Sequence, residues 1–470
     1  MLKQQIIAAI ATPPGEGGIA IIRASGEGAS GLAAKVFRPI SGKDVRQFSG
    51  YSVHFGQIVE NETGETIDEG LLTLFRAPHS YTGEDAFELS CHGGRATTSL
   101  VLQTILGAGA RLAEPGEFTQ RAFMNGRIDL AQAEAVADVI RASADSAQRI
   151  ARRQLEGDLS KAVRSLREEL IGVLAAIEVT IDFSEEVGEL EHEPILRRLT
   201  GVRVEVERLL STAEQGRILR EGVRVALIGR PNVGKSSLFN ALLGSERSIV
   251  THLPGTTRDL LEETANIEGV PLLLVDLAGI RETDNLVERI GVERAEQAAN
   301  ESDLLLLLID GSEGMRKEDR EVLTLVQSIE GSPPLVVVNK SDLAIPERLD
   351  LTVLELNRLL PDSRCLPVSA MTGAGIPELK RQILEVVGGA GFNAEVASRS
   401  VTVSNARHRE ALSVAQGCLL EAMKTTELKL PGDFIAIDAR GALDALGLIT
   451  GQTVTDDIVH RIFRDFCVGK

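Results

Sequence analysis

Unbroken apolar runs separated by polar stretches mark the chain from about residue 223 to residue 387. Four of these runs, at 225–228, 272–275, 304–309 and 335–338, contain no polar residue. A strand buried on both faces has this continuous pattern, whereas a half-exposed strand alternates. The region is therefore predicted to form a parallel sheet covered by helices. It ends in glycine-rich sequence at 388–391.

The stretches on both sides of this region repeat apolar residues every three or four positions, as amphipathic helices do. Between residues 126 and 215 one stripe predicts a long helix packed in a bundle, and its members are Leu155, Leu159, Ala162, Leu166, Leu170, Val173 and Ile177. Two more helical stripes follow the glycines, formed by Leu412, Ala415, Leu419 and Ala422 and by Ile458, Ile462 and Phe466. The α/β region is thus predicted to be inserted into a discontinuous helical domain.

The first 124 residues have a third texture. Short β-like runs at 19–22, 71–75 and 87–89 are broken by glycine and other turn residues, which predicts an α+β domain. Cys91 and His92 follow the last of these runs. Adjacent residues of a strand point to opposite faces, so a role in packing or in a turn is favoured over a metal site or a nucleophile pair that uses both.

Charge and cysteine content narrow the class of protein. The net charge of −18 over 470 residues argues against nonspecific coating of nucleic acid, although a local basic patch or a partner subunit could still bring RNA close. The four cysteines are far apart and form no metal-binding or disulfide pattern; they are Cys91, Cys365, Cys418 and Cys467. The apolar runs at 6–11 and 304–309 are too short for a signal peptide or a membrane span. A cytoplasmic protein without membrane contact is expected.

A phosphate-binding motif follows the first apolar run. Residues 229–236 read Gly-Arg-Pro-Asn-Val-Gly-Lys-Ser and precede an apolar helix start. A strand, a glycine-rich loop and a helix in this order form a P-loop, whose N–H groups cradle phosphates. Lys235 is expected to neutralise phosphate oxygens and Ser236 to ligate Mg²⁺. One such match can be accidental, but further elements follow in the order that a GTPase requires.

Two of these elements are candidate switch segments. Asp276 ends a predicted strand and begins Asp-Leu-Ala-Gly, so that its carboxylate can hold magnesium through water and the N–H of Gly279 can sense the γ-phosphate. Residues 254–259 read Pro-Gly-Thr-Thr-Arg-Asp and supply Thr256 and Thr257 as candidate contacts of Mg²⁺ and the γ-phosphate.

The remaining elements select the base. Asn339-Lys-Ser-Asp342 closes a predicted strand, and the Asp342 carboxylate can accept two hydrogen bonds from guanine that adenine does not offer. Ser369 and Ala370 follow another strand-like run and are expected to support the base. The region is therefore predicted to bind GTP.

Two positions shape the expected catalysis. Ile280 stands where Ras-like proteins carry a water-orienting glutamine, so another group must serve. Glu288 is a candidate to orient or deprotonate the water, or it is a solvated helix residue. The amide oxygen of Asn232 could ligate a monovalent cation together with carbonyls around 251–253, or this side chain only stabilises the loop.

The motifs identify a resemblance. GRPNVGKSSLFNALL, PGTTRD, DLAGIRETDNLVERIGVER and NKSD resemble the TrmE-Era-EngA-like class of P-loop GTPases. The flanking TPPGEGGIAIIRASG, SYTGEDAFELSCHGG, GEFTQRAFMNGRIDLAQAEA, IEVTIDFSEE and the final FCVGK resemble the tRNA-modification GTPase MnmE (TrmE) family, and the resemblance covers essentially the whole chain.

The resemblance implies a fold and an activity. The fold class expected is multidomain α+β and α/β, with a folate-binding-like dimerisation domain at 1–124, a helical domain at 125–216 and 389–470, and a Ras-like GTPase domain at 217–388. The family is a potassium-stimulated GTPase that forms a homodimer and, with the FAD-dependent partner MnmG, a heterotetramer. It modifies C5 of the wobble uridine of certain tRNAs with a carboxymethylaminomethyl or aminomethyl group, using 5-formyltetrahydrofolate or a related one-carbon tetrahydrofolate.

The resemblance also implies roles for residues. The positions expected at the GTP site are Asn232, Val233, Gly234, Lys235, Ser236, Ser237, Thr251, Thr256, Thr257, Asp276, Gly279, Asn339, Lys340, Asp342, Ser369 and Ala370. Those expected to hold K⁺ are Asn232, Thr251, Leu253 and Thr256; those for Mg²⁺ are Ser236 and Thr257; and Glu288 is the expected catalytic residue. For folate they are Arg23, Glu88, Arg127 and Lys470.

The folate positions make chemical sense, because a carboxylate suits the guanine-like edge of a pterin and cations suit a glutamate tail or formyl oxygen. Arg23 as a surface residue and Glu88 in a structural pair are the alternatives. Cys467, three residues before the last residue, is expected near the folate and is a possible functional thiol.

Two other functions are open on the sequence. One is a ribosome-assembly GTPase that acts as a binding switch on rRNA, against which the acidic chain and the FCVGK ending argue. The other is a stand-alone folate-dependent aminomethyltransferase with a regulatory GTPase, for which the sequence offers no convincing base near the folate.

Overall fold

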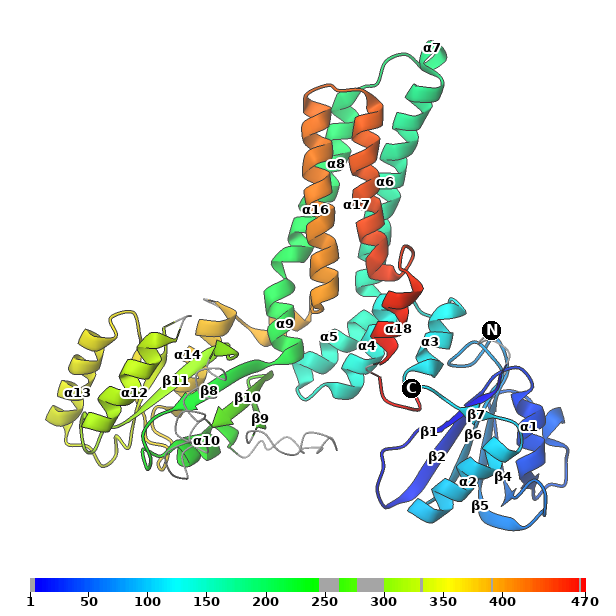
Figure 1. The fold of residues 1–470 in the computed structure, drawn as a ribbon, viewed down its shortest axis with the longest axis horizontal. Coiled ribbons are helices and arrows are strands. Elements are labelled where there is room, and N and C mark those ends of the chain that lie inside the picture. Colours follow the sequence, from blue (N-terminus) through cyan, green and yellow to red (C-terminus); the bar gives the residue numbers. More distant parts are fainter. Residues whose placement is uncertain (1–4, 245–261, 277–299, 330–332, 390–391, 465) are drawn as a thin grey trace, which may run out of the picture. The chain divides into compact units, whose positions relative to one another are not determined.

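The computed structural model describes residues 5–244, 262–276, 300–329, 333–389, 392–464 and 466–470 (Figure 1). The chain forms two compact units, each made of separate stretches. The first unit contains residues 1–137, 154–171 and 443–470, and the second contains residues 138–153 and 172–442.

A seven-stranded sheet forms most of the first unit, in the order β3-β4-β5-β6-β2-β1-β7. Its strands and helices are β1 (Ile7–Ile10), β2 (Gly17–Ser25), α1 (Ala29–Val36), β3 (Phe37–Pro39), the short helix η2 (Val45–Gln47), β4 (Ser52–Val59), β5 (Thr66–Phe75), β6 (Ala86–Gly93), α2 (Arg95–Gly107) and β7 (Arg111–Leu112). Neighbouring strands are antiparallel except β1 and β7. The three predicted β-like runs lie in β2, β5 and β6, which confirms them.

Alternating residues of the central strands give this sheet one buried face. Leu72 and Leu74 of β5 and Phe87 and Leu89 of β6 are fully buried in a core that α1 and α2 complete. The intervening residues point to the opposite face, as the period of two in a strand requires. That opposite face carries Arg23 and Glu88, which face each other across β2 and β6.

A small helical core completes the first unit. It involves α3 (Glu117–Met124), the start of α4 (Leu130–Arg141) and α18 (Asp456–Arg464). Val459 and Phe463 are buried in it and Ile462 packs against it, whereas Ile458 is 37% exposed, so the predicted stripe is wrong at Ile458. Phe466 is buried but lies beyond the end of α18, so it does not report the register of that helix.

The predicted long helix between 126 and 215 is interrupted. The structure has α4, α5 (Asp145–Leu155), α6 (Asp158–Asp182), α7 (Ser184–Val187), α8 (His192–Ser211) and α9 (Ala213–Glu221). Gly157 has a φ of 85°, a left-handed conformation that ends the run begun by α5 and separates Leu155 from the rest of its predicted stripe. The remaining stripe from Leu159 to Ile177 lies on α6, as predicted.

A six-stranded sheet forms part of the second unit, in the order β13-β12-β11-β8-β10-β9, and only β9 is antiparallel to its neighbour. Its elements are β8 (Val223–Ile228), α10 (Lys235–Leu243), β9 (Glu262–Ile267), β10 (Val270–Asp276), β11 (Leu304–Asp310), α12 (Lys317–Ser328), β12 (Leu335–Asn339), α13 (Pro346–Leu359), β13 (Cys365–Pro367) and α14 (Ile376–Gly388).

Strand β11 shows why the apolar runs are continuous. Leu304, Leu306 and Leu308 pack on one side of the sheet with α10 and α14, whereas the residues between them pack on the other side with α12 and α13. Both faces of the strand are buried, so no position is left for a polar side chain. The predicted parallel sheet is confirmed.

The helical part of the second unit contains α8, α15 (Ala394–Ser398), α16 (Ala406–Glu427) and most of α17 (Gly432–Thr450) (Figure 1). Leu412, Ala415, Leu419 and Ala422 are buried on α16, which packs against α8, so that predicted stripe is confirmed. None of the helices in the described segments combines the length and the apolar character needed to cross a membrane.

Candidate functional site

The P-loop joins β8 to α10 at the carboxyl edge of the parallel sheet. Asn232 and Gly234 have φ angles of 65° and 95°, so the loop turns sharply before α10 begins at Lys235. The ammonium of Lys235 donates hydrogen bonds to the carbonyls of Gly229 (2.5 Å) and Arg230 (3.3 Å). Ser236 and Ser237 are exposed in the first turn of α10, where free N–H groups attract anions.

Asn339 joins three of the predicted motifs. It ends β12 and is 1% exposed. Its amide nitrogen donates to the carbonyl of Val233 in the P-loop at 2.9 Å, and its amide oxygen accepts from the N–H of Ala370 at 3.1 Å. The P-loop, Asn339 and Ala370, which are far apart in sequence, are therefore held in one place.

The residues predicted to recognise a guanine base lie beside this junction. Asp342 is exposed, and the N–H of Ser341 donates to the carbonyl of Val368 at 3.1 Å. Ser369 is fully buried, and its hydroxyl accepts the N–H of Thr372 at 3.1 Å, which shapes the turn after β13. The structure thus brings Asp342 and the Ser369–Ala370 turn to the same edge.

Lys340 connects the base-recognition motif to the P-loop. It has a φ of 60°, and its ammonium donates to the carbonyl of Asn232 at 2.8 Å and to the carboxylate of Asp310 at 2.7 Å. Asp310 ends β11 and is 2% exposed. Burial acts to raise the pKa of Asp310, but hydrogen bonds from Lys340 and Ser312 outweigh it and hold the pKa below its usual value.

Sequence reasoning missed a second charged group in this edge. Arg230 lies in the P-loop and is 9% exposed, and its guanidinium forms ion pairs with Asp310 (3.7 Å), Asp319 (3.2 Å) and Glu313. Asp319 is fully buried, and burial raises its pKa. The available signal was the position of Asp310 at the end of a buried strand, where α/β sheets place ligand-contacting residues.

Several predicted residues lie outside what the structure describes. They are Thr251, Leu253, Thr256, Thr257, Gly279, Ile280 and Glu288. Asp276 ends β10, but its side chain also lies outside what the structure describes. Among the residues that are described, no three His, Cys, Asp or Glu side chains gather as a metal-binding cluster.

The first unit brings together three of the four predicted folate residues. Arg23 pairs with the Glu88 carboxylate through Nε (2.8 Å) and a terminal nitrogen (2.7 Å), and its guanidinium lies over the rings of Tyr81 and Phe118. Lys470 interacts electrostatically with both Arg23 and Glu88. Burial first, and then repulsion from Arg23, lower the pKa of the Lys470 amine, although Glu88 acts in the opposite direction.

The C-terminal tail lies against β1. Gly469 has a φ of 94°, and a Cβ there would lie 2.4 Å from the carbonyl oxygen of Ile10. The carbonyl of Cys467 accepts the N–H groups of Gly116 (3.4 Å) and Lys470 (3.3 Å), and its thiol is exposed. Arg127 lies in an exposed turn, and across the described ranges no hydrogen bond or ion pair joins it to Arg23, Glu88 or Lys470.

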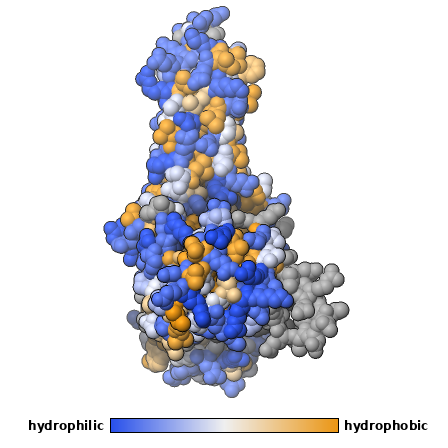
Figure 2. Space-filling model, turned by 90° about the vertical axis from the view of Figure 1, so that its left-hand side faces the viewer, coloured by the Kyte–Doolittle hydropathy of each residue, from blue (hydrophilic) through white to orange (hydrophobic). Residues whose placement is uncertain are grey.

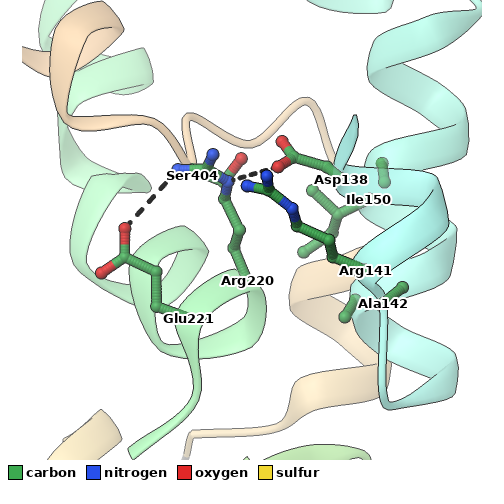
Figure 3. A pocket seen from close by; sticks show the side chains of 9 residues that line it. Asp138, Arg141, Ala142, Ile150, Arg220, Glu221 and Ser404 are labelled. Carbon is green, nitrogen blue, oxygen red and sulfur yellow. Dashed lines mark hydrogen bonds and ion pairs between the residues drawn. The ribbon is translucent and has the colours of Figure 1, made fainter. Parts of the chain in front are cut away.

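A separate cavity of about 180 Å³ lies in the second unit beside α9 (Figure 3). Arg220 of α9 projects into it and forms an ion pair with Asp138 of α4 at 2.9 Å. Helix α9 continues through Gly222 into β8, the strand that leads to the P-loop.

On the face drawn in Figure 2, hydrophilic residues predominate and apolar ones form small groups, as the charge of −18 leads one to expect.

Comparisons with known proteins give a consistent result. Residues 130–467 match the family profile of the MnmE helical domain, and residues 6–127 match that of the GTP-binding protein TrmE N-terminus. The chain is 47% identical to the tRNA modification GTPase MnmE of Moorella thermoacetica over 464 residues, which cover 99% of each chain. It is 46% identical to that of Enterococcus faecalis over 467 residues, which cover 99% of this chain and 98% of the relative.

A solved structure also matches in part. The crystal structure of a variant of Aquifex aeolicus Era bound to GDP and aluminium fluoride is 30% identical to this chain, with a TM-score of 0.31. The match covers 42% of this chain and 67% of the Era chain.

Proposed function

The chain belongs to the MnmE family of tRNA modification GTPases, and from this premise we propose that it modifies C5 of the wobble uridine of certain tRNAs in a potassium-stimulated, folate-dependent reaction with an FAD-dependent partner of the MnmG type. The chain is a GTP hydrolase that acts in tRNA modification. The observation that supports the GTPase part of the proposal is the junction at Asn339, which holds the P-loop and the Ala370 turn at one sheet edge.

The nucleotide would bind with its phosphates at the N-terminus of α10. Lys235 would exchange its bonds to the loop carbonyls for phosphate oxygens, and the exposed Ser236 hydroxyl would ligate Mg²⁺ together with Thr257. A hydroxyl oxygen is the hard ligand that Mg²⁺ prefers. The exposed Asp342 carboxylate would receive the guanine edge.

Potassium would bind beside Asn232. Asn232 has a left-handed backbone and is exposed on the loop, which supports a role for its amide oxygen as a ligand with Thr251, Leu253 and Thr256. A cation there would offset the charge that develops on the transferred phosphate. The GTPase rate in KCl against NaCl at equal ionic strength tests this, and equal rates would refute it. Glu288→Ala should abolish turnover while GTP binding persists.

The folate would bind at Arg23, Glu88 and Lys470, with Arg127 and the thiol of Cys467 near it. The residues fit a reduced folate, because a part-buried carboxylate can receive the pterin edge and two aromatic rings lie within 6 Å of the guanidinium that faces it. When bound, the folate would supply the one-carbon unit. The chain's residues would bind and orient it, with the amine of Lys470 in a position where burial and Arg23 lower its pKa.

A homodimer would use the open face of the seven-stranded sheet. Val53 and Phe55 of β4 and Leu71 of β5 are 58%, 49% and 43% exposed on the face that α1 and α2 do not cover. Three exposed apolar side chains on one sheet face support an interaction surface there. Phe55→Glu should shift the molar mass measured by light scattering toward the monomer, whereas Leu100→Glu, the same change at an exposed position of α2, should not.

In the assembly, two such chains and two flavoprotein chains would form a heterotetramer that receives the tRNA. The ion pair between Arg220 and Asp138 lies where α9 enters β8, which supports a route from the GTPase sheet into the helical domain. GTP hydrolysis would then drive a conformational change that serves the modification.

Nucleoside analysis of tRNA from a strain that lacks the gene tests the proposal most directly. Loss of the C5-modified wobble uridine, restored by the wild-type gene and not by Asp342→Asn, is expected. An unchanged wobble uridine would favour the alternative, a ribosome-assembly GTPase that acts as a binding switch, and ribosome profiles of the same strain would then show a subunit-assembly defect.

A further inference from the structure

The carboxylate of Asp310 is a nearly fully buried charge at the nucleotide edge that the proposed function does not use. It ends β11, between the ends of β8 and β12 in the sheet order. Only 2% of its surface is exposed. A buried carboxylate is costly unless each oxygen is paired, so its partners indicate what it is for.

The two oxygens of Asp310 have different partners. One oxygen accepts the N–H of Ser312 at 3.0 Å and the hydroxyl of Ser312 at 2.6 Å, which fixes the carboxylate to its own loop. The other accepts the ammonium of Lys340 at 2.7 Å and lies 3.7 Å from the guanidinium of Arg230. The second oxygen thus faces two cations, one from the base-recognition motif and one from the P-loop.

These two cations hold the P-loop segment 230–232 from both of its ends. Lys340 continues from Asp310 to the carbonyl of Asn232 at 2.8 Å. Arg230, at the other end, is also paired with Asp319 at 3.2 Å and with Glu313. Asp310 is therefore the one group among these contacts that touches both Lys340 and Arg230.

We propose that Asp310 is a positioning residue of the GTPase site, which holds Lys340 and the 230–232 segment so that Asn232 and the base-recognition motif are set relative to each other. The proposal rests on the proposed nucleotide site at this edge. Asp310 does not touch the nucleotide; it acts through the ammonium of Lys340.

The physical reason is the flexibility of lysine. A lysine ammonium is a strongly hydrated point charge on a stem with several rotatable bonds, so a single carbonyl does not fix it. A charged acceptor on the opposite side roughly doubles the strength of the hydrogen bond and restricts the stem. Without it, Lys340 would leave the Asn232 carbonyl and the loop would lose one of its supports.

Asp310→Asn tests this, because it keeps the shape of the side chain and removes its charge. Arg230 retains two carboxylates in this variant, so the fold of the sheet should persist. Dissociation of N-methylanthraniloyl-GDP should become about 10-fold faster, as expected for loss of one charge-assisted contact. The half-saturating KCl concentration for GTP hydrolysis should rise, because Asn232 is no longer held.

A double-mutant cycle separates positioning from stability. Lys340→Met should also speed GDP release, and the double variant should release GDP no faster than the faster single variant, because both changes break the same contact. Glu355→Gln is the control: it breaks an exposed ion pair with Arg320 in the same sheet domain and should leave the release rate within about 2-fold, as surface pairs contribute little.

The outcomes are distinguishable. A lower melting temperature of Asp310→Asn with an unchanged GDP release rate would mean that Asp310 only stabilises the domain. Rate factors that multiply in the double variant would show that it does not act through Lys340. Failure of the wild-type chain to bind the fluorescent GDP would instead refute the nucleotide site. If Asp310→Asn does not fold, Ser312→Ala, which loses one hydrogen bond to the carboxylate, should speed release about 3-fold, and an unchanged rate would overturn the inference.

Discussion

Asn339→Asp should weaken nucleotide binding more than its small chemical change suggests. The substitution keeps the size of the side chain but replaces an amide nitrogen by a carboxylate oxygen. That nitrogen donates to the carbonyl of Val233 at 2.9 Å, in a place where Asn339 is only 1% exposed. No room exists to turn away, since a Cβ on Gly234 would already lie 2.4 Å from this nitrogen.

The magnitude follows from the two hydrogen bonds of Asn339. The bond from Ala370 survives, because either carboxylate oxygen can accept it. The bond to Val233 is lost, which removes about 1 kcal/mol, and the buried carbonyl left unpaired against an anion costs about 1–3 kcal/mol more. A total near 2.7 kcal/mol corresponds to roughly 100-fold in affinity if it is expressed at the P-loop.

Titration of fluorescent GDP measures the change, and thermal unfolding measures its cost in stability. A loss of that size should lower Tm by about 5–10 °C in a domain of this length. Asn357→Asp, on the exposed side of α13, makes the same chemical change away from the P-loop and should alter neither quantity. GDP affinity of Asn339→Asp within 3-fold of the wild type at an unchanged Tm would refute the reasoning, because the Val233 contact would then carry no energy.

Three further changes have expected outcomes. The pKa of Glu117 is held low by Arg111, the N–H of Glu114 and Arg121 although burial acts first to raise it, so its charge stabilises the fold above its ordinary pKa of 4.5 and this contribution is lost as pH falls below that value. Glu117→Gln should therefore lower Tm at pH 7 and make Tm fall less steeply with decreasing pH than in the wild type. An equally steep fall in the variant would contradict this. Gly469→Ala should displace the C-terminal tail and speed its cleavage by a protease, since the added Cβ would clash with the Ile10 carbonyl. Cleavage at the wild-type rate would contradict the packing of the tail. Gly216→Val should lower Tm strongly, because even a Cβ would lie 2.1 Å from the Val403 carbonyl, and an unchanged melting curve would show that α9 can shift.

The sequence was informative where one physical rule acts alone. Strands such as β11 are buried on both faces, and only apolar residues satisfy that, so the parallel sheet could be read from continuous runs. The P-loop, Asn339 and Ala370 could be expected together for a similar reason, since the carboxyl ends of parallel strands meet at one edge. The contact itself, from an amide to the Val233 carbonyl, depends on side-chain geometry and was not predictable.

The prediction failed where two residues or two helices compete. In α18 adjacent apolar residues allow two helical faces, and the face that packs contains Val459, Ile462 and Phe463 but leaves Ile458 exposed. At Gly157 the stripe of apolar residues continues through a position where the backbone reverses, so periodicity alone did not reveal the break. The ion pair between Asp310 and Arg230 was not predicted, because Asp310 ends one strand and Arg230 follows another, and only the fold places them together.

The candidate folate site shows the same dependence on folding at the scale of the whole chain. Arg23 lies near the start of the sequence and Lys470 is its last residue, yet both belong to the first unit and their charges interact. The tail reaches this place because Gly469 adopts a left-handed conformation that no larger residue could take against the Ile10 carbonyl. Lys470 therefore joins Arg23 and Glu88 only through the folded position of the tail, which is why spacing along the sequence could not predict this group.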